Sequence, residues 1–219
     1  MIAVFATVTN FCFAQENKTV QGKNMTVKPS SRIGSTVGFQ NLWVCGCWSC
    51  PEINDATGVS IFYHQTISAN TFLSFEVGYH KHLSERLEYS TTYHFRQNRW
   101  WAETVYYWKD EYKFTFIPVT VGINCFLTKE GIRPYIGLEI GFLNTIEKYK
   151  TENYWIAAGA TFSETYKYTD FLFVPTLGFS APITKNICIN ANIKLQFDMA
   201  GHSIFFNTGM NVGVAFQIP

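Results

Sequence analysis

The chain has 219 residues, of which 17% are aromatic and 15% charged, and its formal net charge is +1. A disordered chain contains few aromatic residues, and a soluble protein carries about a quarter charged residues, so the composition argues against both classes. The near-zero net charge predicts no nucleic acid or other polyanion as a partner. No run approaches the roughly 18 apolar residues of a membrane-spanning helix, so a membrane location requires strands.

The first 14 residues are predicted to form a secretory signal peptide. Met1 to Ala14 is a short apolar run that ends in Cys12-Phe13-Ala14, with small residues where a signal peptidase reads, and cleavage is expected before Gln15. The alternative is a first strand or a buried segment. Residues 15–32 are polar and show no alternation, so they are predicted to be a flexible periplasmic leader.

Three of the six cysteines crowd into one segment, at Cys45, Cys47 and Cys50. In an exported protein a local disulfide is expected there, between Cys45 and Cys50, because cysteines only two positions apart close a strained ring. The alternative is a metal site. A zinc site takes four ligands and this segment offers three, so neither a metal nor another cofactor is predicted.

Eight segments alternate between apolar and polar residues, with the period of a β-strand. They are expected at about 33–44, 59–66, 71–82, 112–126, 132–149, 169–183, 188–198 and 206–218. Residues 84–111 carry a weaker alternation that predicts strands extending beyond the membrane. Residues 150–167 are predicted to form a polar, aromatic loop.

The segment from Tyr112 to Phe142 has the clearest pattern, an antiparallel hairpin with a turn at Thr128 to Gly131. One face is apolar, and the other carries glycine and small polar residues where a soluble barrel would carry lysine and glutamate. This pattern is typical of a barrel that is apolar toward lipid and polar toward its lumen. The predicted fold class is all-β: an eight-stranded antiparallel up-and-down transmembrane β-barrel over residues 33–219.

The connections after the second, fourth and sixth strands are short, and those after the first, third and fifth are long. Outer-membrane barrels show this asymmetry, with tight periplasmic turns and longer external loops. Aromatic residues lie at the long-loop ends, where an interfacial girdle is expected: Trp43, Trp100, Trp101, Trp108, Tyr112, Tyr149 and Trp155. The predicted location is therefore the bacterial outer membrane, with outer-membrane lipid as a partner.

Three stretches of the chain resemble the PorT-like outer-membrane β-barrel domain family. They are Phe116-Ile117-Pro118-Val119, the run Arg133-Pro134-Tyr135-Ile136-Gly137-Leu138-Glu139-Ile140-Gly141, and the closing segment Gly209 to Ile218. The likeness covers roughly residues 33 to 219 in order and spacing. It implies an outer-membrane barrel and no particular activity. The chain departs from the family in its three-cysteine first loop and in ending on Pro219.

A few charged residues fall on the polar face of the predicted strands. Counted upward from the short turns, Glu76, Glu139 and Lys194 come to lie at similar depth. Arg133 sits lower on the same face and is long enough to reach up toward that layer. Because eight strands enclose a lumen that side chains fill, these charges are predicted to plug the barrel and to pair with one another or with Tyr135, Asn124, Asn192 and Gln196.

Three functions are consistent with such a chain. The first is a non-enzymatic barrel, structural or partner-binding, whose long loops 84–111 and 150–167 contact other envelope proteins. The second is an outer-membrane enzyme acting on lipid or peptide, for which the candidate residues are His80, His82, His94 and His202 with Ser203. No acid partner is recognisable by spacing, so no catalytic residue is predicted. The third, a soluble lipocalin-like barrel, requires the apolar face inside and a charged exterior.

Overall fold

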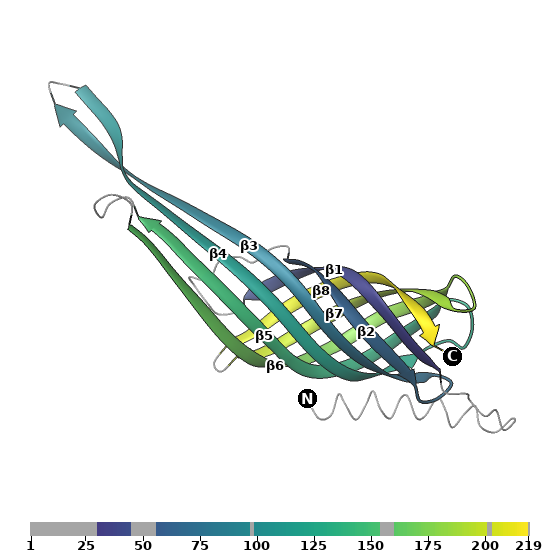
Figure 1. Ribbon diagram of the computed structural model, residues 1–219. Helices are drawn as coiled ribbons and strands as arrows, with labels where there is room; N and C mark the ends of the chain where they lie inside the picture. The colour runs from purple at the N-terminus through teal and green to yellow at the C-terminus, as the bar shows by residue number, and fades with distance from the viewer. Residues whose placement is uncertain (1–29, 45–55, 97–98, 154–159, 201–202, 219) are drawn as a thin grey trace, which may run out of the picture.

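The computed structural model describes residues 30–44, 56–96, 99–153, 160–200 and 203–218, and its elements are eight strands. Their bounds are β1 (Ser31–Val44), β2 (Ala56–Thr66), β3 (Thr71–Arg96), β4 (Arg99–Phe126), β5 (Arg133–Asn153), β6 (Ala160–Pro182), β7 (Ile187–Ala200) and β8 (Ser203–Ile218). Each strand pairs antiparallel with the next, and β8 pairs with β1 to close the barrel (Figure 1). The predicted fold class is confirmed. Among the described residues, no helix is long and apolar enough to cross a membrane.

The alternation in sequence becomes two faces of the barrel wall. On β1, Val37 and Phe39 are 63% and 65% exposed, whereas Gly34, Thr36 and Gly38 are buried. The exposed apolar residues of the wall form a belt around the barrel, which includes Ile33, Val37, Phe39, Val59, Ile61, Phe75, Val77, Val119, Val121, Ile140, Phe142, Leu177, Phe179, Ile189, Ile193, Met210, Val212, Val214 and Phe216. A continuous apolar surface of this size is unfavourable in water and is the surface that lipid tails contact.

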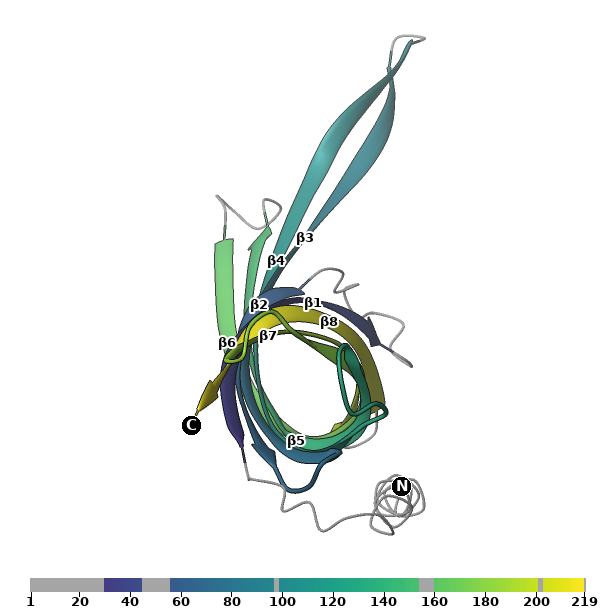
Figure 2. The ribbon, with the colours of Figure 1, turned by 90° about the vertical axis from the view of Figure 1, so that its right-hand side faces the viewer.

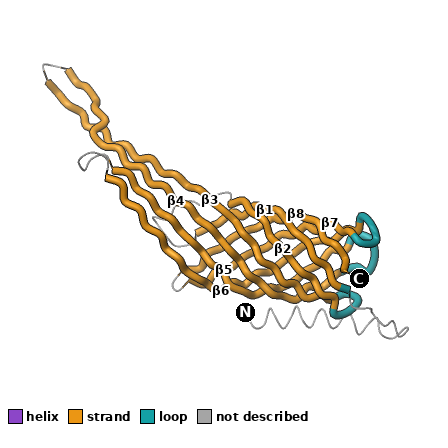
Figure 3. Tube along the Cα trace, in the orientation of Figure 1, coloured by secondary structure: helices purple, strands orange, loops and turns teal. Residues whose placement is uncertain are grey.

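The short turns lie together at one end of the barrel, where Figure 3 shows them in teal. In the β2–β3 and β6–β7 turns, Ser68 and Thr184 each accept a hydrogen bond from a backbone amide three residues later, at 3.2 and 3.1 Å. In the β4–β5 turn, Gly131 has a φ of 69°, a left-handed conformation that favours glycine. These local devices fix the register of three hairpins.

The strands differ greatly in length, and this difference shapes the opposite end. β3 and β4 have 26 and 28 residues, and β5 and β6 have 21 and 23, whereas β2 has 11 and β7 has 14. The pairing of β2 with β3 ends at Lys81, and that of β6 with β7 begins at Phe171. Beyond these points β3 to β6 continue as an open sheet that projects away from the ring (Figures 1 and 2). We call this part the extension: residues 82–96, 99–115, 144–153 and 160–170.

The extension confirms the strands predicted within 84–111 and corrects the loop predicted at 150–167. β6 begins at Ala160, not near residue 169, because residues 160–170 pair with β5 along their whole length, for example Ser163 with Lys150. At the other end of the chain, β1 begins at Ser31, so the last residues of the expected leader belong to the barrel.

Candidate functional site

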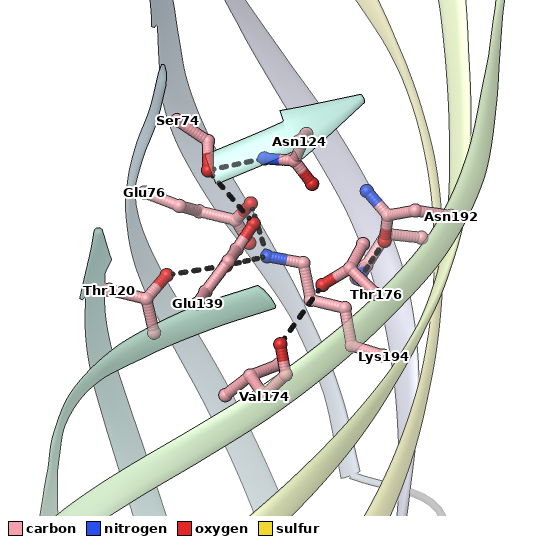
Figure 4. Close-up of polar contacts among 10 residues, drawn as sticks. Ser74, Glu76, Thr120, Asn124, Glu139, Val174, Thr176, Asn192 and Lys194 are labelled. Atoms are coloured by element: carbon pink, nitrogen blue, oxygen red, sulfur yellow. Dashed lines mark hydrogen bonds and ion pairs between the residues drawn. The ribbon is translucent and has the colours of Figure 1, made fainter. Parts of the chain in front are cut away.

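The middle of the lumen holds a charged cluster centred on Lys194 of β7 (Figure 4). Its Nζ lies 2.7 Å from Oε2 of Glu76 and 2.8 Å from Oε2 of Glu139. The side chains of Lys194 and Glu139 are only 3% and 4% exposed. The three residues come from β3, β5 and β7, and the inward phase of each strand brings their side chains to one level.

Neutral side chains donate further hydrogen bonds to the Glu139 carboxylate. Thr120 Oγ1 donates to Oε2 at 2.8 Å, and Ser74 Oγ donates to Oε1 at 3.1 Å. Asn124 Nδ2 in turn donates to Ser74 Oγ at 2.8 Å. A buried charge is costly unless it is both paired and hydrogen-bonded, so this shell is what makes the pair tolerable.

The sequence-based reasoning named Asn124 as a partner but missed Thr120 and Ser74. The register of the strands is the property that could have identified them. Thr120 pairs with Glu76 across β3 and β4, and Gly122 pairs with Glu139 across β4 and β5. Gly122 leaves room for the Glu139 side chain, because a Cβ at Gly122 would overlap the Glu139 Cγ and the Leu138 backbone.

Two apolar layers enclose the charged cluster. Toward the short turns, the rings of Phe72, Phe126 and Tyr135 pack together, with Phe72 and Phe126 centroids 4.7 Å apart. Toward the extension lies a second buried cluster, made of Ala56, Phe114, Phe116, Leu143, Leu172 and Val174. A low-dielectric environment strengthens the ion pairs between these layers. The described side chains thus fill the lumen as a packed core.

Arg133 requires a correction, because it does not join the charged cluster. Its Nη2 donates to the carbonyl of Ala69 at 2.9 Å and its Nε to the carbonyl of Thr128 at 3.4 Å. Its guanidinium lies 3.7 Å from the centroid of the Phe126 ring. The Arg133 guanidinium is thus satisfied at the short-turn end of the barrel, by the backbone carbonyls of two adjacent turns and by an aromatic face. To reach Glu139 it would have to cross the layer of Phe72, Phe126 and Tyr135.

The other residues singled out in the sequence are not assembled into a site by the described residues. His80 and His82 lie on the inner face of β3, with His80 buried and the His82 ring 6.3 Å from that of Phe114. His202, the side chain of His94, the cysteine segment with Cys45 and Cys50, and residues 1–29 fall outside the described residues. Within the described ranges, no three His, Cys, Asp or Glu side chains lie close enough together to hold a metal ion.

The face of the extension that continues the lumen wall is rich in aromatic residues. We call it the inner face; it carries Tyr112, Tyr149, Phe162, Tyr166 and Tyr168. The rings of Tyr112 and Tyr149 lie 4.9 Å apart, and the Tyr149 hydroxyl donates to Asp110 at 2.9 Å. Phe162 and Tyr166 are 52% and 49% exposed. Burial and the nearby Glu147 raise the pKa of Tyr168 to about 12.

The chain matches no family model, and no curated protein matches its sequence. Solved structures do match. Ail, the attachment invasion locus protein of Yersinia pestis, has a TM-score of 0.52 and 12% identity, over 88% of this chain and 100% of Ail. The outer membrane protein OprG from Pseudomonas aeruginosa has a TM-score of 0.52 and 9% identity, over 87% of this chain and 95% of OprG.

The fold is that of an eight-stranded outer-membrane barrel. Neisserial surface protein A also matches, at a TM-score of 0.48 and 12% identity, over 86% of this chain and 98% of that chain. At such identities the likeness concerns the fold alone. The closed barrel and its exposed apolar belt place the protein in the bacterial outer membrane, because a span in lipid must satisfy every backbone polar group internally.

Proposed function

We propose that this protein is a non-enzymatic outer-membrane barrel that binds a partner at the cell surface through the inner face of the extension. The observation that carries the proposal is the open sheet itself, with exposed aromatic side chains on the face of β6 opposite the one that continues the apolar belt. Long strands and loops lie on the external side of such barrels, so this sheet projects outward from the cell.

The chemistry of the inner face suits a protein or peptide partner. Tyrosine and phenylalanine provide large contact areas at low conformational cost, and tyrosine adds a hydrogen-bonding hydroxyl. The β6 edge adds a second means of binding, since residues 160–170 pair with β5 on one side and with no described strand on the other. An extended partner segment would add to this edge by main-chain hydrogen bonds. Other envelope proteins are the partners expected from the sequence.

The packed lumen supports a structural role for the charged cluster and argues against transport or catalysis inside the barrel. Ser74 donates to Glu139, but both lie between two apolar layers where a substrate has no access. We infer that the cluster stabilises the barrel and sets its register. We also propose that the chain belongs to the PorT-like outer-membrane β-barrel domain family. The support is the run from Arg133 to Gly141, preceded by Phe116-Ile117-Pro118-Val119 and followed by the closing segment Gly209 to Ile218.

Site-specific photo-crosslinking in intact cells tests the proposal. A photoreactive residue at Tyr166, on the inner face of β6, is expected to give protein adducts of defined mass. The same residue at Thr165 is the matched control, because this adjacent exposed position lies on the opposite face of the strand. Absence of adducts at Tyr166 in a folded, surface-exposed protein, or equal adducts at both positions, would contradict the proposal.

A further inference from the structure

The outer face of β3 to β6, where the extension leaves the ring, carries one lysine from each of the four strands at one level. Lys113 of β4 pairs directly with Lys148 of β5. Lys81 pairs with Thr115 while Leu83 pairs with Lys113, so Lys81 is diagonal to Lys113. Lys167 is diagonal to Lys148 in the same way, since Lys148 pairs with Thr165 and Ile146 with Lys167. We call Lys81, Lys113, Lys148 and Lys167 the lysine row.

The lysine row lies directly above the apolar belt. Val77, Val119, Phe142 and Phe171 pair in sequence across the same four strands and are all exposed. Lys81 is about 13 Å further along β3 than Val77, at a rise of about 3.3 Å per residue, which is about 10 Å along the barrel axis because the strand is tilted. Its Nζ lies 5.3 Å from the centroid of the exposed Tyr79 ring. The height of Lys81 above the apolar belt is the height at which lipid headgroups begin.

Carboxylates neutralise this row only in part. Lys113 pairs with Glu111 at 2.5 Å, and this contact holds the pKa of the Glu111 carboxyl below its usual range. Among the described residues, no carboxylate lies within ion-pair distance of Lys81, Lys148 or Lys167. Other lysines of the same face do have such partners, as Lys109 pairs with Glu85 and Lys150 with Glu152.

Like charges placed directly opposite each other on neighbouring strands destabilise a sheet. The Lys113–Lys148 pair is such an arrangement, and an anion between the two ammonium groups converts it into a favourable one. A cavity of about 640 Å³ provides the space: Lys81, Lys113, Lys148, Thr57 and Thr115 are among the residues that line it. Ammonium and hydroxyl groups together match the acceptor oxygens of a phosphate.

We propose that the lysine row binds the phosphate groups of an anionic lipid headgroup in the outer leaflet. The site adjoins lipid-facing side chains, so the acyl chains of one molecule lie on the belt while its phosphates meet the lysines. Basic residues beside a membrane attract anionic headgroups in this manner. The net charge of +1 gave no indication of it, because the strand pairing gathers lysines that are far apart in sequence.

Native mass spectrometry of the full chain, folded in neutral micelles and titrated with diphosphorylated lipid A, tests the proposal. The variant K81Q/K148Q removes two lysines that have no carboxylate partner among the described side chains. The control K129Q/K185Q removes two exposed lysines from the short turns and changes the net charge equally. Affinity is expected to fall roughly fivefold per lysine, hence roughly twenty-five-fold for K81Q/K148Q, and to stay at the wild-type value for the control.

Two comparisons identify the source of the phosphate. Dephosphorylated lipid A is expected to bind far more weakly than the diphosphorylated form, and inorganic phosphate at matched phosphate concentration is expected not to displace it. Equal binding by K81Q/K148Q and the wild type, or equal binding of dephosphorylated lipid A, would overturn the proposal. Full displacement by inorganic phosphate, or by a soluble polyanion such as heparin, would assign the row to a ligand in solution and overturn the lipid site.

Discussion

Replacing Lys194 by methionine removes the cation that two carboxylates share. Glu139 and Glu76 would keep their negative charges close together, and Glu139 is nearly inaccessible to water. Breaking a buried ion pair by removing one partner costs about 3 to 5 kcal/mol. This range applies here, because two acids lose their partner and the apolar layers on both sides keep water away.

Urea unfolding of the protein in micelles measures this cost, with folded and unfolded forms separated on unboiled gels. Lys194→Met is expected to lower the free energy of unfolding by about 3 to 5 kcal/mol. Lys185→Met, in an exposed turn, is expected to stay within about 0.5 kcal/mol of the wild type. Neutralising the acids as well, in K194M/E76Q/E139Q, should restore part of the loss, since no uncompensated charge then remains in the cluster. A loss below about 1 kcal/mol for Lys194→Met would refute the idea of a dry, tightly coupled cluster.

Three further outcomes follow from the structure. Because the apolar belt requires lipid, the protein should remain in the membrane fraction after alkaline and urea extraction, and it should migrate differently on gels before and after boiling. Recovery in the soluble periplasmic fraction would contradict the membrane location. Because packed side chains fill the lumen, planar bilayers containing the wild-type protein should show little or no steady conductance, and a large ohmic current would disprove the plug. A Cβ at Gly141 would overlap the Val119 carbonyl oxygen, so Gly141→Ala should lower the free energy of unfolding by about 1 to 3 kcal/mol, measured by the same urea assay; an unchanged midpoint would show that β4 and β5 separate easily there.

The sequence predicted the barrel well wherever the two faces of a strand meet different environments. Between Thr169 and Pro182, the lipid-facing and lumen-facing residues alternate, and strand β6 was expected there. Between Ala160 and Asp170, most positions face water on either side, so polar residues occur in both phases and the strand was predicted as a loop. Periodicity reports a difference between faces, and the difference is weak here because Glu164 and Asp170 interrupt the aromatic residues of the inner face.

The charged cluster was predictable in part for a similar reason. Glu76, Glu139 and Lys194 come from strands whose short turns lie at one end, so counting residues from each turn places them at one depth. Arg133 has a long side chain near a turn, and its direction depends on the Ala69 carbonyl, which only the folded barrel brings near. The lysine row was missed because it depends on exact register between strands that the sequence does not provide.

The seam between β1 and β8 has a consequence for how the molecule is made. It pairs Ser31 with Ile218 and Val44 with Phe205, so the first strand of the barrel completes its hydrogen bonds only with the last. Joining such distant segments lowers the conformational entropy of the chain, and this loss comes late in folding. A nascent chain cannot close the ring before its C-terminal strand is available. Until closure, Lys194 on β7 and Glu76 on β3 have no shared interior in which to meet. Ring closure and charge pairing therefore become a single cooperative event, and an incomplete barrel exposes its own uncompensated charges.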